Sequence, residues 1–141
     1  MNLRHRLVLI VVFALITAAS AQAHHSFSGA FDINKQIALK GVISKIEWVN
    51  PHVYIYLDVK DSDGTLTTWA LESLPTNHLR NAGITKQDIW NKAGEGEVVT
   101  VNVYESKDPA NHRAGWLLRI TYPDGHFLHV SGDPNEIVAT K

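Results

Sequence analysis

The sequence predicts a mainly β protein: a small OB-like barrel of five to six strands with a short helical insert, preceded by a signal-peptide helix. Three observations support this prediction. Apolar and polar residues alternate with a period of two over most of the chain after residue 36, which is typical of half-buried strands. One segment in the middle of the chain carries helix start and stop signals instead. The first 23 residues have the pattern of an export signal.

The predicted signal peptide occupies residues 1–23. A short basic region precedes an apolar run over residues 7–19, which has the length of a signal-peptide core and is too short for a mature membrane span. Ala21 and Ala23 are the small residues that signal peptidase recognises. We therefore expect a Sec-type signal peptide and a periplasmic or secreted protein that starts at His24, with membrane contact only before cleavage. An uncleaved anchor helix is the alternative.

The composition excludes several classes of function. Loss of the predicted signal removes two arginines and no acidic residue, which changes the net charge from −1 to −3. A weakly acidic surface argues against binding to nucleic acid. The chain has no cysteine, so disulfides, thiolate chemistry and thiolate zinc sites are excluded. The remaining length suits a single domain with one core.

The predicted domain organisation follows the signal. We expect an N-terminal arm over residues 24–35, a barrel domain over residues 36–131 and a flexible tail over residues 132–141. The predicted strands cover residues 36–48, 52–59, 66–72, 97–104, 116–122 and 126–130. The order of a long bent strand, a hairpin, a helical insert and further strands is that of the oligonucleotide/oligosaccharide-binding type of barrel. A β-sandwich is the structural alternative.

The apolar positions of the strands predict which side chains form the core. In the first strand the apolar parity changes after Ile43, so we expect a bulge or kink, with Gly41 as its natural place. Trp48 and Trp69 are expected to pack in the core or at the barrel ends. The expected core of the other strands consists of Val53, Ile55, Leu57, Val99, Val101, Val103, Leu118 and Ile120.

The helical insert is predicted from its boundary residues. Pro75 suits the start of a short helix, and Gly83 suits its end. Thr85 and Asp88 have the spacing of a capping box that starts a second helical turn. The hairpin before the insert turns at residues 61–64, where a glycine supplies the positive φ of the turn.

The sequence resembles an uncharacterised family of small secreted bacterial proteins. The resemblance is carried by the His-His-Ser-Phe start at residues 24–27, the Trp-Val-Asn-Pro-His run at residues 48–52 and the hairpin at residues 58–64. It covers nearly all of the predicted mature chain. It implies export and a small β-barrel, and it implies no established activity.

The histidines provide the candidate metal site. Cleavage before His24 would let the α-amine and imidazole of that residue chelate one metal ion, and His25 adds a second imidazole. His52, at the start of the second strand, is a third candidate ligand. Nitrogen-rich sites of this kind suit copper(II), which also has the highest affinity among the divalent ions. The arrangement resembles the histidine brace of secreted copper proteins in its terminal histidine. One alternative is that the histidines bind metal only adventitiously, so that the protein has no cofactor. The other is that His52 has a structural role.

Tyr54 and Tyr56 are the candidate ligand-binding residues, because they lie on the strand face opposite the apolar positions. The sequence contains no nucleophile elbow, zinc-protease helix or phosphate loop, so no catalytic residue is predicted. The leading hypothesis is an exported, non-enzymatic module that binds a metal ion or a small ligand, with copper as the candidate metal. The alternatives are a cell-envelope adaptor that binds a partner protein through the tyrosine face, and a metal-dependent enzyme.

Overall fold

The computed structural model describes residues 27–93 and 96–131. The predicted signal peptide, its cleavage site, the first three residues of the N-terminal arm and the predicted tail lie outside the described residues. Within them, no helix is both long enough and apolar enough to cross a membrane. The four-residue helix α2 (Phe27–Ala30) belongs to a different compact unit from the barrel, which begins at Phe31.

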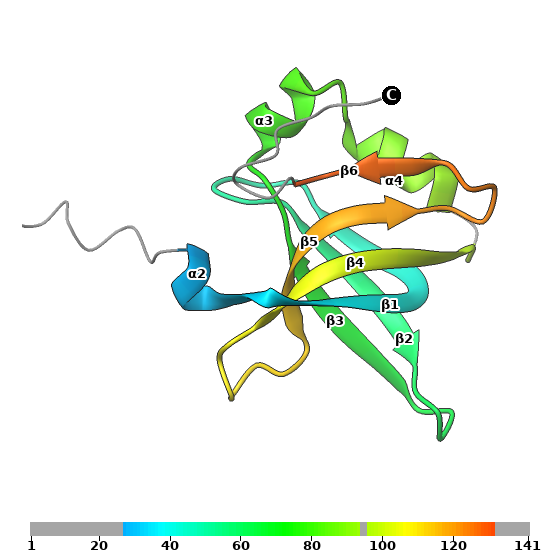
Figure 1. The fold of residues 1–141 in the computed structure, drawn as a ribbon. Helices are drawn as coiled ribbons and strands as arrows, with labels where there is room; N and C mark the ends of the chain where they lie inside the picture. The colour runs from blue at the N-terminus through cyan, green and yellow to red at the C-terminus, as the bar shows by residue number, and fades with distance from the viewer. Residues whose placement is uncertain (1–26, 94–95, 132–141) are drawn as a thin grey trace, which may run out of the picture. The chain divides into compact units, whose positions relative to one another are not determined.

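Six strands form one sheet that closes on itself (Figure 1). They are β1 (Phe31–Glu47), β2 (Tyr54–Lys60), β3 (Leu66–Glu72), β4 (Val98–Ser106), β5 (Ala114–Thr121) and β6 (Phe127–His129). Their order is β3-β2-β1-β4-β5-β6, and a parallel pairing of β3 with β5 closes the first five strands into a barrel. The predicted OB-like barrel is therefore confirmed, and closure by β3 and β5 rules out the β-sandwich.

The long first strand is shared between two neighbours. Residues 36–42 of β1 pair with β4, and residues 41–47 pair with β2. The strand starts at Phe31, five residues before the expected start, because Phe31 pairs with Ser106 beyond an irregularity in the register between Phe31 and Gln36. The hairpin of β2 and β3 turns at the expected residues 61–64, and Lys60 lies opposite Leu66 next to the turn.

The predicted change of parity in β1 is present, but its position was predicted wrongly. Ile43 lies opposite Leu57 and Lys45 lies opposite Tyr56, so the extra residue of the bulge is Ser44 and not Gly41. The bulge moves the buried side from the odd-numbered Ile43 to the even-numbered Ile46. Gly41 instead serves a close approach between β1 and β2: an added Cβ would overlap the carbonyl oxygen of Asp58.

The expected core is confirmed with one correction. A single cluster of buried side chains includes seven of the eight predicted residues, and Trp48 and Trp69 pack against it. Leu118 is buried but lies outside that cluster, and Leu117 takes the core position. The reason is a second bulge: Val103 pairs with Leu117 and Asn102 pairs with Arg119, which leaves Leu118 without a partner position in β4.

The helical insert forms as predicted. Pro75 precedes α3 (Thr76–Asn81), and Gly83 follows it with a φ of 74°. Thr85 caps α4 (Lys86–Ala93): its backbone N–H donates to the Asp88 carboxylate at 2.8 Å, and the Asp88 N–H donates to the Thr85 hydroxyl at 3.2 Å. Both helices lie at the end of the barrel that carries β6 (Figure 1). The Tyr122 hydroxyl ties α4 there by donating to the carbonyl of Ile89 at 3.3 Å.

Candidate functional site

The candidate site lies where β3 ends and β5 begins, around His52. Glu72, the last residue of β3, pairs with Trp116 of β5 in parallel register and with Tyr54 of β2 in antiparallel register. Residues that pair across neighbouring strands have their side chains on the same face of the sheet. The buried residues of β2 have the opposite parity, so this face is the outer face of the barrel.

His52 and Glu72 are hydrogen-bonded, with the Nδ1 atom of His52 meeting the Oε1 atom of Glu72. Both side chains are partly buried, with 35% of His52 and 22% of Glu72 exposed. Burial, followed by the neighbouring Glu72 carboxylate, raises the pKa of the Tyr54 hydroxyl, which therefore remains protonated. The Glu72 carboxylate thus lies close to two side chains of the site.

One aromatic ring contacts the imidazole, and a second packs against the first. The ring of Trp116 meets that of His52 edge-on, with the centroids 5.7 Å apart and the planes at 87°. On its other side, Trp116 packs against Phe31, also at 5.7 Å. Phe31 and Trp116 are buried outside the main core cluster. This aromatic packing limits the rotation of the imidazole and gives the site an apolar wall.

A second polar network lies next to the first on the same face. The Tyr56 hydroxyl donates to Glu47 at 3.1 Å, and the ammonium group of Lys45 pairs with the same carboxylate while lying 5.0 Å from the centre of the Tyr56 ring. The hydrogen bond from Lys45, followed by that from Tyr56, lowers the pKa of Glu47. Burial raises the pKa of the Tyr56 hydroxyl, and the hydrogen bond to Glu47 adds to this effect. Tyr56 is therefore bound to a carboxylate, and both Tyr54 and Tyr56 are half-buried.

The arrangement gives His52 one engaged and one available nitrogen. Because a carboxylate accepts the hydrogen bond at Nδ1, the neutral ring carries its proton there and has its lone pair on Nε2. Within the part of the chain that the structure describes, Nε2 has no hydrogen bond from a protein group. Such a nitrogen can bind a metal ion or accept a proton. No group of three or more metal-binding side chains occurs among the described residues, so His52 would need ligands from elsewhere to hold a metal.

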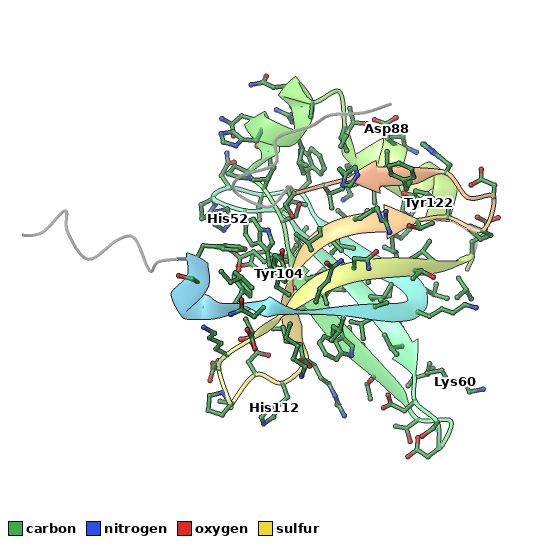
Figure 2. The ribbon with its side chains drawn as sticks, in the orientation of Figure 1. His52, Lys60, Asp88, Tyr104, His112 and Tyr122 are labelled. Carbon is green, nitrogen blue, oxygen red and sulfur yellow. The ribbon has the colours of Figure 1, made fainter. Side chains whose placement is uncertain are left out.

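The structure brings together three of the predicted site residues and leaves two outside. His52, Tyr54 and Tyr56 share the outer face near the start of β2, whereas His24 and His25 lie outside the described residues. Figure 2 shows His112 on the loop between β4 and β5, away from His52. None of the three expected residues on the face is buried in the core.

Glu72, Trp116 and Phe31 are the site residues that the sequence analysis missed. For Glu72 a signal existed: a hairpin whose turn is centred near residue 63 pairs Tyr54 with Glu72 and brings that carboxylate to the residues preceding β2. Trp116 and Phe31 reach the site through barrel closure, which depends on contacts between residues far apart in the sequence. The hydrophobic pattern of the separate strands does not show which residues this closure brings together.

Comparison with known proteins identifies a family whose function is unknown. The family model described as a family of unknown function, DUF6152, matches residues 12–116. The match covers most of the chain, including the site around His52, and confirms the resemblance to an uncharacterised family. No curated protein matches the sequence.

Proposed function

We propose that this chain, which belongs to the family of unknown function DUF6152, is an exported binding module that takes up copper(II) through the mature N-terminal residues His24 and His25. His52 is the further candidate ligand. The observation that carries the proposal is the pairing of His52 with Glu72. Histidines that bind metal ions commonly donate their other ring N–H to a carboxylate, which fixes the ring and raises its basicity as a ligand.

The chemistry of the N-terminus supports copper(II) as the metal. After cleavage behind Ala23, the α-amine and the imidazole of His24 can close a chelate ring on one ion, and His25 adds another nitrogen. Nitrogen ligands in a tetragonal arrangement are typical of copper(II) sites. The absence of cysteine from the chain leaves imidazole and amine nitrogens as the main ligands for a transition metal.

The adaptor hypothesis has less support from the outer face. The Tyr56 hydroxyl already donates to Glu47 within the chain, so a partner protein would have to compete with that bond or use the ring surfaces of the tyrosines. The enzyme hypothesis would need a substrate site next to His52. The metal-binding proposal uses the nitrogen that His52 leaves available, together with the mature N-terminus.

The proposal requires a defined processing event. We expect the exported protein to begin at His24, because Ala21 and Ala23 form the cleavage site behind the apolar run. The intact mass and the N-terminal sequence of protein recovered from the periplasm measure this directly. An Ala21→Leu variant should remain unprocessed, because the recognised small residue is lost. Retention of the wild-type chain in the membrane, or a start at another residue, would contradict the proposed site.

Copper binding should depend on the free amine of His24. We expect a Gly-Gly-Gly extension before His24 to weaken copper(II) binding by more than about tenfold, or ~1.4 kcal/mol, because it removes the amine from the chelate ring. A competitive titration against a copper chelator measures the affinity. Three glycines are used because a single one would make His25 the third residue, and an amine with a histidine at that position is itself a copper chelator.

Two further measurements make this test specific. Copper binding to the native form should release protons, because the α-amine, with a pKa near 8, must lose its proton to coordinate. His52→Ala should weaken binding, whereas His78→Ala, at an exposed position in α3, should leave the affinity unchanged. Equal affinities of the extended and native forms would refute the proposed N-terminal site. An unchanged affinity of His52→Ala would remove His52 from the ligand set.

A further inference from the structure

We propose that Glu72 is the positioning residue of His52, and that it holds the imidazole as the Nδ1–H tautomer with Nε2 directed away from the pair. The orientation of His52 follows from the geometry of the barrel. The consequence for copper(II) rests on the proposed function. Glu72 would then contribute to metal affinity without binding the metal, through the ring that it fixes.

The position of Glu72 is set by the barrel and not by His52. As the last residue of β3, it pairs with Tyr54 on one side and with Trp116 on the other, so its backbone is hydrogen-bonded within two ladders. His52, in contrast, precedes β2 and lies next to Pro51, outside the strand. Glu72, which the sheet holds in place, therefore positions His52, which is less constrained.

The ring of Trp116 restricts the imidazole in a second direction. Its edge-on contact with His52, at an angle of 87° between the planes, fills the space on one side of the ring. Rotation of His52 that broke the bond to Glu72 would also disrupt this contact. Two independent contacts thus define the orientation of the ring.

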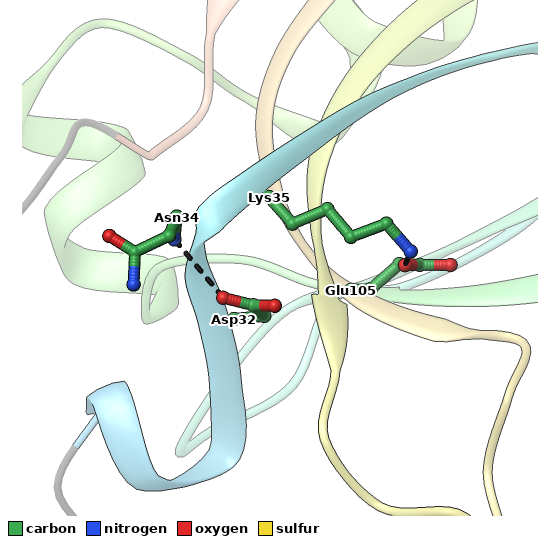
Figure 3. A network of polar contacts seen from close by, with 4 residues as sticks. All are labelled: Asp32, Asn34, Lys35 and Glu105. Atoms are coloured by element: carbon green, nitrogen blue, oxygen red, sulfur yellow. Dashed lines mark hydrogen bonds and ion pairs between the residues drawn. The ribbon is translucent and has the colours of Figure 1, made fainter.

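An ion pair elsewhere on the barrel provides a matched control. Lys35 pairs with Glu105 between β1 and β4, and 27% of the Glu105 side chain is exposed, close to the 22% of Glu72 (Figure 3). Lys35 is 60% exposed, and its ammonium group has neither tautomers nor a ring whose orientation could be fixed. Exposed pairs of this kind contribute little to stability. The variant Glu105→Ala therefore removes a carboxylate of similar exposure without changing His52.

The first measurement uses metal-free protein and tests the orientation alone. At a pH of about 8.5, well above the usual histidine pKa near 6.5, the ¹⁵N chemical shifts of the ring distinguish the two neutral tautomers. We expect the Nδ1–H form for His52 in the wild type, its partial retention in Glu72→Gln, whose amide oxygen can still accept, and a mixture in Glu72→Ala. Glu105→Ala should resemble the wild type. An Nε2–H tautomer in the wild type would overturn the inference.

The second measurement tests the consequence for the metal by a double-mutant cycle. Glu72→Ala should weaken copper(II) binding by about 10–100-fold, the usual effect of losing a carboxylate behind a metal-binding histidine. In a His52→Ala background the same change should have no further effect, because Glu72 acts through His52. Glu105→Ala should not alter the affinity, and denaturant titration confirms that each variant is folded.

The outcomes separate the two proposals. A loss of affinity from Glu72→Ala that persists without His52 would overturn the positioning role. If the expected tautomer is found and copper affinity depends on neither His52 nor Glu72, the orientation stands and the participation of His52 in the proposed function fails. If the tautomer of His52 is the same in Glu72→Ala as in the wild type, Glu72 does not position the ring, whatever the copper affinities are.

Discussion

Replacing Leu57 with alanine should destabilise the barrel by about 3 kcal/mol, within the ~2–5 kcal/mol typical of such truncations in a core. Leu57 is fully buried in the main cluster, at the centre of β2, and its neighbours on both sides are strands of the closed barrel. The surrounding strands cannot easily move into the space, because the sheet is closed on itself. Part of the cost therefore comes from the cavity that remains, in addition to the lost burial.

Tyr56→Ala is the matched control for Leu57→Ala, because the adjacent residue points to the outer face. Tyr56 loses a hydrogen bond to Glu47 and a contact with Lys45, both partly in solvent, so we expect a loss of about 1 kcal/mol. Urea titrations of both variants measure the free energy of unfolding, and an unchanged m-value shows that the comparison is valid. Equal losses for the two variants would mean that the faces of β2 are reversed.

The separation of the two faces could be predicted from sequence because it depends on local alternation. The alternation in β2 placed Val53, Ile55 and Leu57 in the core and the tyrosines outside, and the structure has this arrangement. The register of the hairpin was predictable for a similar reason, since the glycine turn at residues 61–64 defines it. Such features depend on residues that are close in sequence.

The bulges were harder to predict, because they depend on pairing between strands. The change of parity in β1 showed that the strand must contain an extra residue. The bulge was predicted at Gly41 because glycine often occurs at bulges, whereas the extra residue is Ser44. In β5 the apolar residues Leu117 and Leu118 are adjacent, so alternation alone could not decide which of them faces the core. The register of β4 against β5 decides it in favour of Leu117.

The site also combines features set by neighbouring residues with contacts between residues that are far apart in the sequence. His52 was identified from its position between a proline and a strand of alternating residues. Its partner Glu72 is 20 residues away; the hairpin register, extended to its open end, brings the two together. The aromatic wall of Trp116 and Phe31 required the closed barrel. The chemistry of the site thus arises from contacts that the separate motifs do not contain.

The second large effect is expected at Gly41. This residue pairs with Val59 of β2 and with Val99 of β4, so it lies where β1 is hydrogen-bonded on both edges. A Cβ there would overlap the carbonyl oxygen of Asp58 and lie 3.1 Å from the Cγ atom of Leu57. Relief of the overlap would need movement of backbone, because Asp58 is itself held in the sheet. Glycine in a strand often marks such a close approach of two backbones.

We therefore expect Gly41→Ala to destabilise the protein by about 3 kcal/mol, at the upper end of the range for overpacked positions. Gly125→Ala is the control: it has a φ of 84° and no atom within 4 Å of the added Cβ, so it should cost only about 1–2 kcal/mol through backbone conformation. Denaturant titration of both variants gives the comparison. A loss below that of Gly125→Ala would show that β1 and β2 can separate at Gly41, and that the close approach is not required to close the barrel.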